Sequence, residues 1–296
     1  MGKLSRATVR APASSANLGP GFDCLGLALG LHDEVSAEIT GSGVSVEVEG
    51  EGSGSVATDE HHLVAATMLR TFEEFGLEPP GLRLKCRNRI PHARGLGSSS
   101  AAIVAGIMLA DELAERRLSR PDKLALASEI EGHPDNVAPC LLGGLTIAYT
   151  TEDRARAVSV EPSPRIRPRL FVPTRQGLTA AARAALPERV GYEDAVYNLS
   201  RAALLVDAVT RKPSRLFDAT DDRLHQSYRA EGMPESAELL RRLRSTGIAA
   251  AISGAGPTVI ALCVDGAPVP AEPEGFEVMR LEVVSGAAIV TDREPE

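Results

Sequence analysis

The sequence predicts an α+β fold with two domains, residues 1–160 and 161–296. Two kinds of hydrophobic pattern are mixed along the chain. Alternation of apolar and polar residues predicts strands, and apolar residues three and four positions apart predict helices. Residues 151–168 are polar and rich in proline, which favours a boundary between the domains in this stretch.

The first domain is expected to contain mixed strands and helices. Apolar residues from Leu82 to Ile90 alternate with arginine and lysine, the pattern of a strand with one wet face, and apolar residues at helical spacing follow Ser98. Ser119 is a plausible N-cap for a further helix. The expected strands are 6–11, 35–40, 44–49, 82–90 and 144–149, and the expected helices are 61–75, one from 98 and one from 119.

The second domain is expected to follow the same mixed pattern. It opens with a strand at 170–172, continues through helices near 193–211 and 235–245, and ends in strands near 248–252, 258–264, 277–283 and 286–291. Residues 267–275, rich in proline, alanine and glutamate, are expected to form a surface loop.

Composition excludes several classes of protein. Of 296 residues, 43% are hydrophobic and 24% are charged, which is typical of a globular chain. The formal net charge of −8 and the lack of a basic run argue against a nucleic-acid partner or an anionic membrane surface. The N-terminal charges are followed by no apolar segment, and no apolar run is long enough to span a bilayer.

The four cysteines, Cys24, Cys86, Cys140 and Cys263, form no C-x-x-C pair. We therefore expect buried free thiols in a cytoplasmic protein.

Residues 91–102, Pro-His-Ala-Arg-Gly-Leu-Gly-Ser-Ser-Ser-Ala-Ala, join the strand at 82–90 to an apolar helix. Gly95 and Gly97 permit positive φ and close approach to a ligand, and three serines supply hydroxyls and free amides at the helix N-terminus. The loop lacks the lysine of a Walker A motif and the third glycine of a dinucleotide fingerprint. A phosphate cradle is one interpretation, and a tight turn capped by serine is the other.

Four further segments are polar and broken by glycine or proline. In chain order they are Ala11–Asp23, Glu129–Pro139, the pair Thr179–Arg183 and His225–Arg229, and Ile252–Thr258. From the residues alone, the first segment is interpreted as an ordinary turn and the fourth as a connection between strands. The arginines of the third are interpreted as solvated side chains.

The pattern P-x-x-x-G-L-G-S-S-x-A of residues 91–101 is similar to the second motif of the GHMP kinases, the small-molecule kinases named for galactose, homoserine, mevalonate and phosphomevalonate. S-S-A-N-L-G-P-G-F-D at 14–23 resembles the first motif of the members that phosphorylate L-homoserine, E-G-H-P-D-N at 131–136 resembles another segment of the family, and residues 252–258 resemble the third motif. The resemblance covers nearly the whole chain.

The resemblance implies an N-terminal domain like the second domain of ribosomal protein S5, a ferredoxin-like C-terminal domain, ATP in the cleft between them, and a homodimer. It implies phosphorylation of L-homoserine to O-phospho-L-homoserine, on the route to threonine. Another GHMP kinase acting on a different alcohol, or a catalytically silent relative that binds a small molecule, is the alternative.

The resemblance also implies roles for individual residues. ATP would be held by Pro91, His92, Ala93, Arg94, Gly95, Leu96, Gly97, Ser98, Ser99, Ser100 and Ala101, and Mg²⁺ by Ser98 and Glu131. The substrate would be held by Asn17, Asp23, His133, Asp135, Asn136, Thr179, Arg183, Arg229 and Gly254. Asp135, Ser98 and Glu131 would be catalytic. Two questions stay open: whether Glu129 rather than Glu131 binds the metal, and whether Asp135 deprotonates the hydroxyl or only orients it. Contacts to adenine are not assigned, because His61 and His62 stand where the family often has asparagine.

Overall fold

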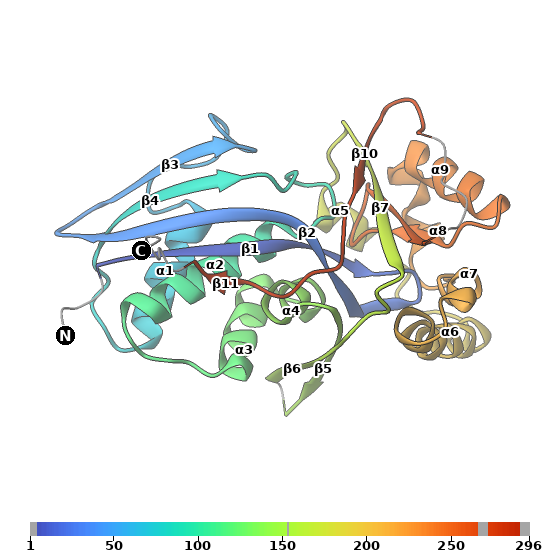
Figure 1. The fold of residues 1–296 in the computed structure, drawn as a ribbon, viewed down its shortest axis with the longest axis horizontal. Coiled ribbons are helices and arrows are strands. Elements are labelled where there is room, and N and C mark those ends of the chain that lie inside the picture. Colours follow the sequence, from blue (N-terminus) through green and yellow to red (C-terminus); the bar gives the residue numbers. More distant parts are fainter. Residues whose placement is uncertain (1–4, 153, 266–271, 291–296) are drawn as a thin grey trace.

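The computed structural model describes residues 5–290 except 153 and 266–271 (Figure 1). Among these residues, no helix is both long and apolar enough to cross a membrane. These described residues form two sheets, one of seven strands and one of four, and helices pack against both.

The larger sheet is built around two long antiparallel strands that run along the body of the molecule (Figure 1). Its central order is β11-β1-β2-β4-β3, and β5 pairs with β2 and with β6. Among the strand pairs of the described residues, β3 and β4 alone run parallel to one another. The strands are β1 (Arg6–Asn17), β2 (Gly21–Thr40), β3 (Val44–Gly50), β4 (Gly81–Asn88), β5 (Leu145–Thr151), β6 (Arg154–Val160) and β11 (Ala288–Ile289).

The helices of this half lie on one side of the sheet (Figure 1). They are α1 (Leu63–Glu74), α2 (Ser98–Leu113), α3 (Arg120–Glu131) and α4 (Pro134–Leu142). Helix α2 is apolar around most of its circumference because it lies between β1 and the other helices of this layer. Its N-terminus carries the glycine and serine loop of the second motif.

The smaller sheet is antiparallel with the order β10-β7-β9-β8. Its strands are β7 (Ile166–Pro173), β8 (Ala250–Ile252), β9 (Val259–Val264) and β10 (Phe276–Arg280). The helices of this half are α5 (Thr179–Ala184), α6 (Tyr192–Thr210), α7 (Leu216–Ala219), α8 (Gln226–Arg229) and α9 (Pro234–Ser245), with single 3₁₀ turns at Pro213–Arg215 and Ala230–Gly232. One hydrophobic cluster is continuous from the larger sheet to residues of α6 and β9, such as Leu205 and Ile260.

The predicted α+β class is confirmed, and several local predictions need correction. Strand β1 continues through residues 11–17, which the sequence suggested was a turn, because its small residues are buried against β2. Residues 154–160 form strand β6, within the stretch in which the sequence favours a domain boundary. The strand expected at 277–283 ends at Arg280, and the last one covers only 288–289 of the described residues. Strand β11 pairs with β1, so the chain returns to the first sheet after β10, and the division at residue 160 stays a prediction.

The cysteine prediction is partly correct. All four cysteines are free, and Cys86 and Cys140 are buried. Cys24 and Cys263 are only partly buried. Burial raises the pKa of the Cys86 thiol to about 12, so it is an inert packing group at neutral pH.

Candidate active site

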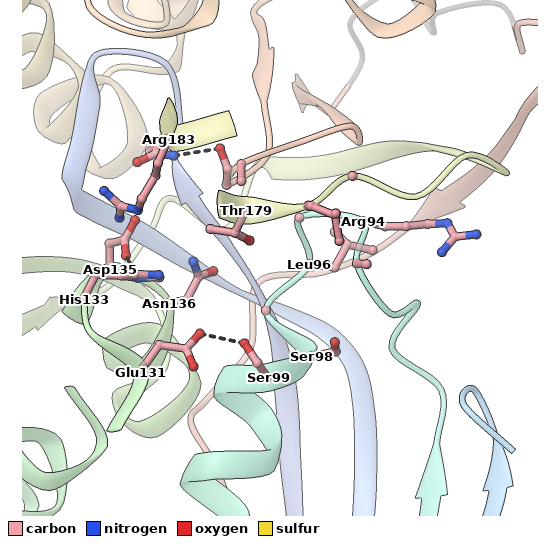
Figure 2. Close-up of a pocket in the computed structure, with 18 of the residues that line it drawn as sticks. Arg94, Leu96, Ser98, Ser99, Glu131, His133, Asp135, Asn136, Thr179 and Arg183 are labelled. Atoms are coloured by element: carbon pink, nitrogen blue, oxygen red, sulfur yellow. Dashed lines mark hydrogen bonds and ion pairs between the residues drawn. The ribbon is translucent and has the colours of Figure 1, made fainter. Parts of the chain in front are cut away.

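A cavity of about 270 Å³ lies where the two halves of the chain meet, and the segments singled out from the sequence converge on it (Figure 2). It is lined by the hairpin between β1 and β2, the loop before α2, the ends of α3 and α4, α5 and α8, and the turn between β8 and β9. Polar atoms from segments more than 200 residues apart in the sequence, such as Asn17 and Gly254, are in direct contact there.

The loop before α2 needs glycine at two positions for a steric reason. Gly97 is the N-cap of α2 with φ of 70°, and a Cβ atom there would lie 2.0 Å from Oγ of Ser14. A Cβ atom on Gly95 would lie 2.2 Å from the carbonyl oxygen of Ser253. The backbone therefore passes closer to its neighbours than a side chain would permit, and the first amides of α2 are left for a ligand.

The glycine-rich turn between β8 and β9 packs directly on this loop. Ser253 Oγ donates a hydrogen bond to the carbonyl of Gly95 at 2.6 Å. Asn17 Nδ2 donates to the carbonyl of Gly254 at 2.8 Å, while Asn17 Oδ1 accepts from the amide of Asp23 at 3.0 Å. Asn17 lines the cavity, but its amide group already joins the first motif to the third.

Not every residue of the predicted ATP loop reaches the cavity. Residues 93–99 line it, whereas Pro91, His92, Ser100 and Ala101 do not. The guanidinium of Arg94 turns away and donates to the carbonyls of His92, Pro173 and Thr174, so this arginine fastens the loop to the end of β7 (Figure 2). The loop supplies mainly backbone amides and hydroxyls to the cavity.

Glu131 ends α3 and faces the serines at the start of α2. Its Oε1 accepts hydrogen bonds from Oγ of Ser99 at 2.6 Å and of Ser100 at 2.9 Å, and none from Ser98 (Figure 2). Glu129, the other carboxylate considered from the sequence, pairs with Arg70 and does not line this cavity. Carboxylate and hydroxyl oxygens are the ligands that Mg²⁺ prefers, so Glu131 and the serines fit such an ion.

His133 and Asp135 form a second pair on the same wall. Gly132 ends α3 with φ of 90°, and the chain re-enters a helix at Pro134, which places Asp135 in the first turn of α4. His133 Nδ1 lies 2.6 Å from Oδ1 of the buried Asp135, and this hydrogen bond raises the pKa of His133 above its ordinary value. The next residue, Asn136, lines the cavity and accepts a hydrogen bond from Ser14.

The charged side chains expected to hold a substrate line the same cavity. Arg183 of α5 forms a bidentate pair with Asp23, with distances of 3.0 and 2.8 Å. Asp23 has φ of 53°, an unusual value for a residue other than glycine. Thr179, at the start of α5, also lines the cavity. Arg229 is buried rather than solvated, and desolvation lowers its pKa.

Several residues at the site escaped the sequence analysis. Gly177, Leu178 and Ala255 line the cavity as direct neighbours of motif residues. The centroid of the Phe22 ring lies 5.8 Å from the guanidinium of Arg183 and 5.2 Å from that of Arg229. Its position as the aromatic residue of the first motif was the sequence signal that could have identified Phe22 as a site residue.

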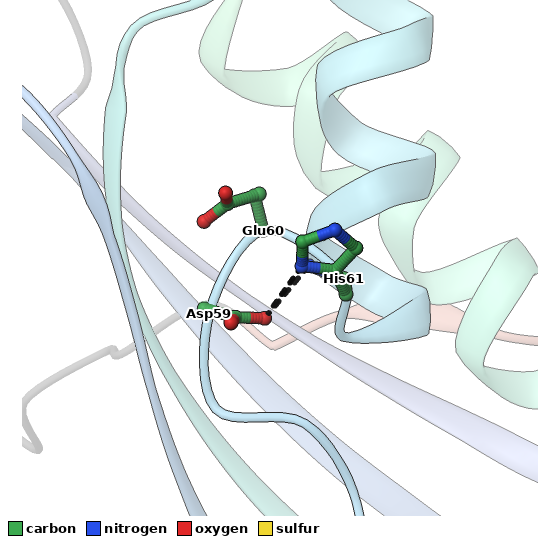
Figure 3. A group of neighbouring side chains, drawn as sticks. All are labelled: Asp59, Glu60 and His61. Carbon is green, nitrogen blue, oxygen red and sulfur yellow. Dashed lines mark hydrogen bonds and ion pairs between the residues drawn. The ribbon is translucent and has the colours of Figure 1, made fainter.

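The two histidines at the start of α1 have separate positions. His61 is exposed and contacts Asp59 at 3.1 Å, in a cluster with Glu60 (Figure 3). His62 is buried, caps α1 and accepts a hydrogen bond from the amide of Val64. Neither lines the cavity, and the contacts to adenine stay unassigned.

Comparison with known proteins gives the class to which this fold and this site belong. A family model described as the GHMP kinases N terminal domain matches residues 62–144, and one described as GHMP kinases C terminal matches residues 205–272. A crystal structure of mevalonate diphosphate decarboxylase from Staphylococcus aureus has the same fold, with a TM-score of 0.67 at 15% identity over 97% of this chain and 98% of that one. The chain belongs to the GHMP kinases.

Several relatives with high identity are homoserine kinases. The one from Streptomyces coelicolor is 55% identical over 88% of this chain and 85% of its own length, and the one from Mycolicibacterium vanbaalenii is 48% identical over 95% and 94%. A crystal structure of homoserine kinase from Cytophaga hutchinsonii superposes with a TM-score of 0.83 at 25% identity, over 98% of this chain and 99% of that one. Within the GHMP kinases, this chain is therefore placed among the homoserine kinases.

Proposed function

We propose that this chain transfers the terminal phosphoryl group of ATP to the side-chain hydroxyl of L-homoserine, forming O-phospho-L-homoserine. The observation that carries the proposal is the composition of one cavity. A glycine-rich helix N-terminus suited to phosphate lines the same cavity as a carboxylate and two arginines suited to the ammonium and carboxylate of an amino acid.

In this proposal, residues 93–99 hold the phosphates of ATP. The backbone amides at the start of α2 and the positive end of its dipole neutralise phosphate charge. Glu131 and a serine hydroxyl hold Mg²⁺, which when bound shields the charge on the transferred phosphoryl group. Ser99 is favoured over Ser98 as the hydroxyl ligand, because its Oγ already lies 2.6 Å from Glu131.

Asp135 acts on the hydroxyl of the substrate. One of its oxygens is engaged by His133 at 2.6 Å, which fixes the carboxylate in the wall of the cavity. Phosphoryl transfer through a loose transition state depends on positioning more than on early removal of the proton. We therefore infer that Asp135 orients the attacking hydroxyl rather than acting as an obligatory base.

The substrate binds by opening the pair between Asp23 and Arg183. The α-ammonium group takes the place of the guanidinium beside Asp23, and the α-carboxylate takes the place of Asp23 beside Arg183. Each charge that is separated in this way finds a new partner of opposite sign. Arg229, the second arginine of the cavity, also binds the α-carboxylate, and Thr179 completes the wall that contacts the amino acid. By the resemblance, we also infer that the protein works as a homodimer in the cytoplasm.

The test is an ADP-release assay with homoserine, serine, threonine, mevalonate and shikimate as acceptors. We expect turnover with homoserine at a kcat/KM at least about tenfold above every other acceptor, because only it combines a zwitterion with a hydroxyl at the correct distance. Preference for mevalonate or shikimate, which carry no ammonium group, would contradict the assignment of Asp23. Binding of homoserine without turnover would indicate a silent relative.

A further inference from the structure

His225 is completely buried beside the cavity and is not among the described residues that line it. Its two ring nitrogens contact two different parts of the site. Nε2 lies 2.8 Å from the carbonyl oxygen of Gly19, in the hairpin of the first motif, and Nδ1 lies 3.2 Å from Nη1 of Arg229. The ring also stacks on Phe22, with 5.1 Å between centroids.

These two contacts determine the tautomer of His225. A guanidinium group can only donate hydrogen bonds, so Nδ1 must accept and carries no proton. A carbonyl oxygen can only accept, so Nε2 carries the hydrogen and donates it to Gly19. The ring is therefore neutral when both contacts are made. Burial favours the same state, because it lowers the pKa of His225 below its ordinary value.

The surroundings of Arg229 leave one of its nitrogens free. Nε donates to the carbonyl of Ala182 at 3.1 Å, and Nη1 donates to the carbonyl of Gly254 at 3.2 Å as well as to His225. Among the described residues, Nη2 has no hydrogen-bond partner, although the side chain as a whole is only 2% exposed and lines the cavity. The protein thus fixes the plane of the guanidinium and leaves Nη2 for a ligand.

The backbone of His225 is held independently of its ring. Asp222 accepts hydrogen bonds from the backbone amides of His225 at 3.1 Å and of Gln226 at 2.9 Å. A substitution of the imidazole therefore leaves the local backbone with its anchor. This separation makes the contribution of the ring measurable.

We propose that His225 is a positioning residue for recognition of the substrate carboxylate: as a neutral imidazole it holds Arg229 through Nδ1 and the Gly19 hairpin through Nε2. The inference rests on the proposed function, in which Arg229 binds the α-carboxylate of homoserine. It predicts that loss of the Nδ1 acceptor raises the KM for homoserine and leaves the KM for ATP unchanged.

The test compares three substitutions of His225. Asn places an amide oxygen near the position of Nδ1 and can still accept from Arg229, whereas Gln places its amide near Nε2 and keeps only the donor to Gly19. Leu keeps neither. We expect His225→Asn to stay within about threefold of the wild-type KM for homoserine, and His225→Gln and His225→Leu to raise it roughly ten- to hundredfold, the range for one lost hydrogen bond to a charged group.

A matched control exists elsewhere in the chain. Arg10 Nη2 contacts His32 Nδ1 at the same distance, 3.2 Å, on the exposed face of the large sheet. His32→Gln should leave both KM values unchanged. If His225→Leu does not fold, as judged by circular dichroism, the comparison of His225→Asn with His225→Gln decides. Equal KM values for these two variants would overturn the proposal.

Arg229→Lys separates failure of this inference from failure of the proposed function. If the KM of Arg229→Lys for homoserine is normal, Arg229 does not bind the carboxylate and the proposed role of Arg229 is wrong. If Arg229→Lys raises this KM, His225→Leu added to it should cause little further change. Fully additive effects of the two substitutions would show that His225 does not act through Arg229, and would refute the inference alone.

Discussion

Arg183→Ala tests whether the residues of the ion pair between Arg183 and Asp23 bind the substrate or mainly stabilise the fold. Both side chains are 38% exposed, so the pair is partly solvated despite its bidentate geometry. Such pairs contribute about 0.2–1 kcal/mol to the free energy of unfolding. In a chain of this length, 1 kcal/mol shifts Tm by about 2–4 °C, and we therefore expect Tm to fall by no more than about 4 °C.

The effect on the substrate should be larger. Loss of a charge-assisted hydrogen bond to the α-carboxylate costs about 1.5–3 kcal/mol. Arg183→Ala also releases Asp23 from its partner, which favours binding of the ammonium group by up to about 1 kcal/mol and offsets part of that loss. With the full offset, the difference of about 0.5–2 kcal/mol corresponds to a KM for homoserine raised roughly two- to thirtyfold, with the KM for ATP nearly unchanged.

The assay follows ADP release with one substrate varied at saturating concentration of the other, and thermal unfolding is recorded in parallel. Arg83→Ala is the matched control, because Arg83 pairs with Glu38 at 3.0 Å on the exposed sheet face, away from the cavity. It should change neither KM. A fall in Tm of more than about 8 °C for Arg183→Ala with an unchanged KM for homoserine would refute the reasoning, since the pair would then be structural.

The remaining predictions concern Glu131, Asp135 and Gly97 of the same cavity. Glu131→Gln should abolish turnover while homoserine binding, measured by calorimetry, stays nearly intact. Glu129→Gln should have turnover close to that of the wild type. The reverse result would show that Glu129, not Glu131, binds the metal. Asp135→Asn should lower turnover about tenfold if the carboxylate orients the hydroxyl, and a loss beyond about a thousandfold together with loss of the acidic limb of the pH profile would establish a base. The same substitution should lower the pKa of His133 measured by NMR, since Asp135 is what raises it. Gly97→Ala should raise the KM for ATP more than that for homoserine, because its φ of 70° and the 2.0 Å approach to Ser14 force the loop to move; equal changes in both KM values would contradict a role confined to the phosphates.

The positions of the motif loops could be predicted because their chemistry is local. The change from alternating residues before Ile90 to helical spacing after Ser98 marks the end of β4 and the start of α2. The glycines between them indicate a turn with positive φ, which depends only on the local sequence. The same local patterns predicted the mixed α+β class. They failed at residues 11–17, because small polar residues buried in a strand resemble those of a turn.

Contacts between segments distant in the sequence could not be predicted from local sequence patterns. Successive residues of a helix point in directions about 100° apart, so only the packing of α3 beside α2 decides that Ser99 and Ser100, rather than Ser98, contact Glu131.

The sequence by itself determined the loop that can hold phosphate, the fold class and the types of side chain available for an amino acid. Only the tertiary structure decided that Asp23 and Arg183, 160 residues apart, pair with each other and that Arg229 is buried on His225. The physical reason is that strand and helix patterns report which face of an element is buried, whereas the partner on that face depends on how the elements pack.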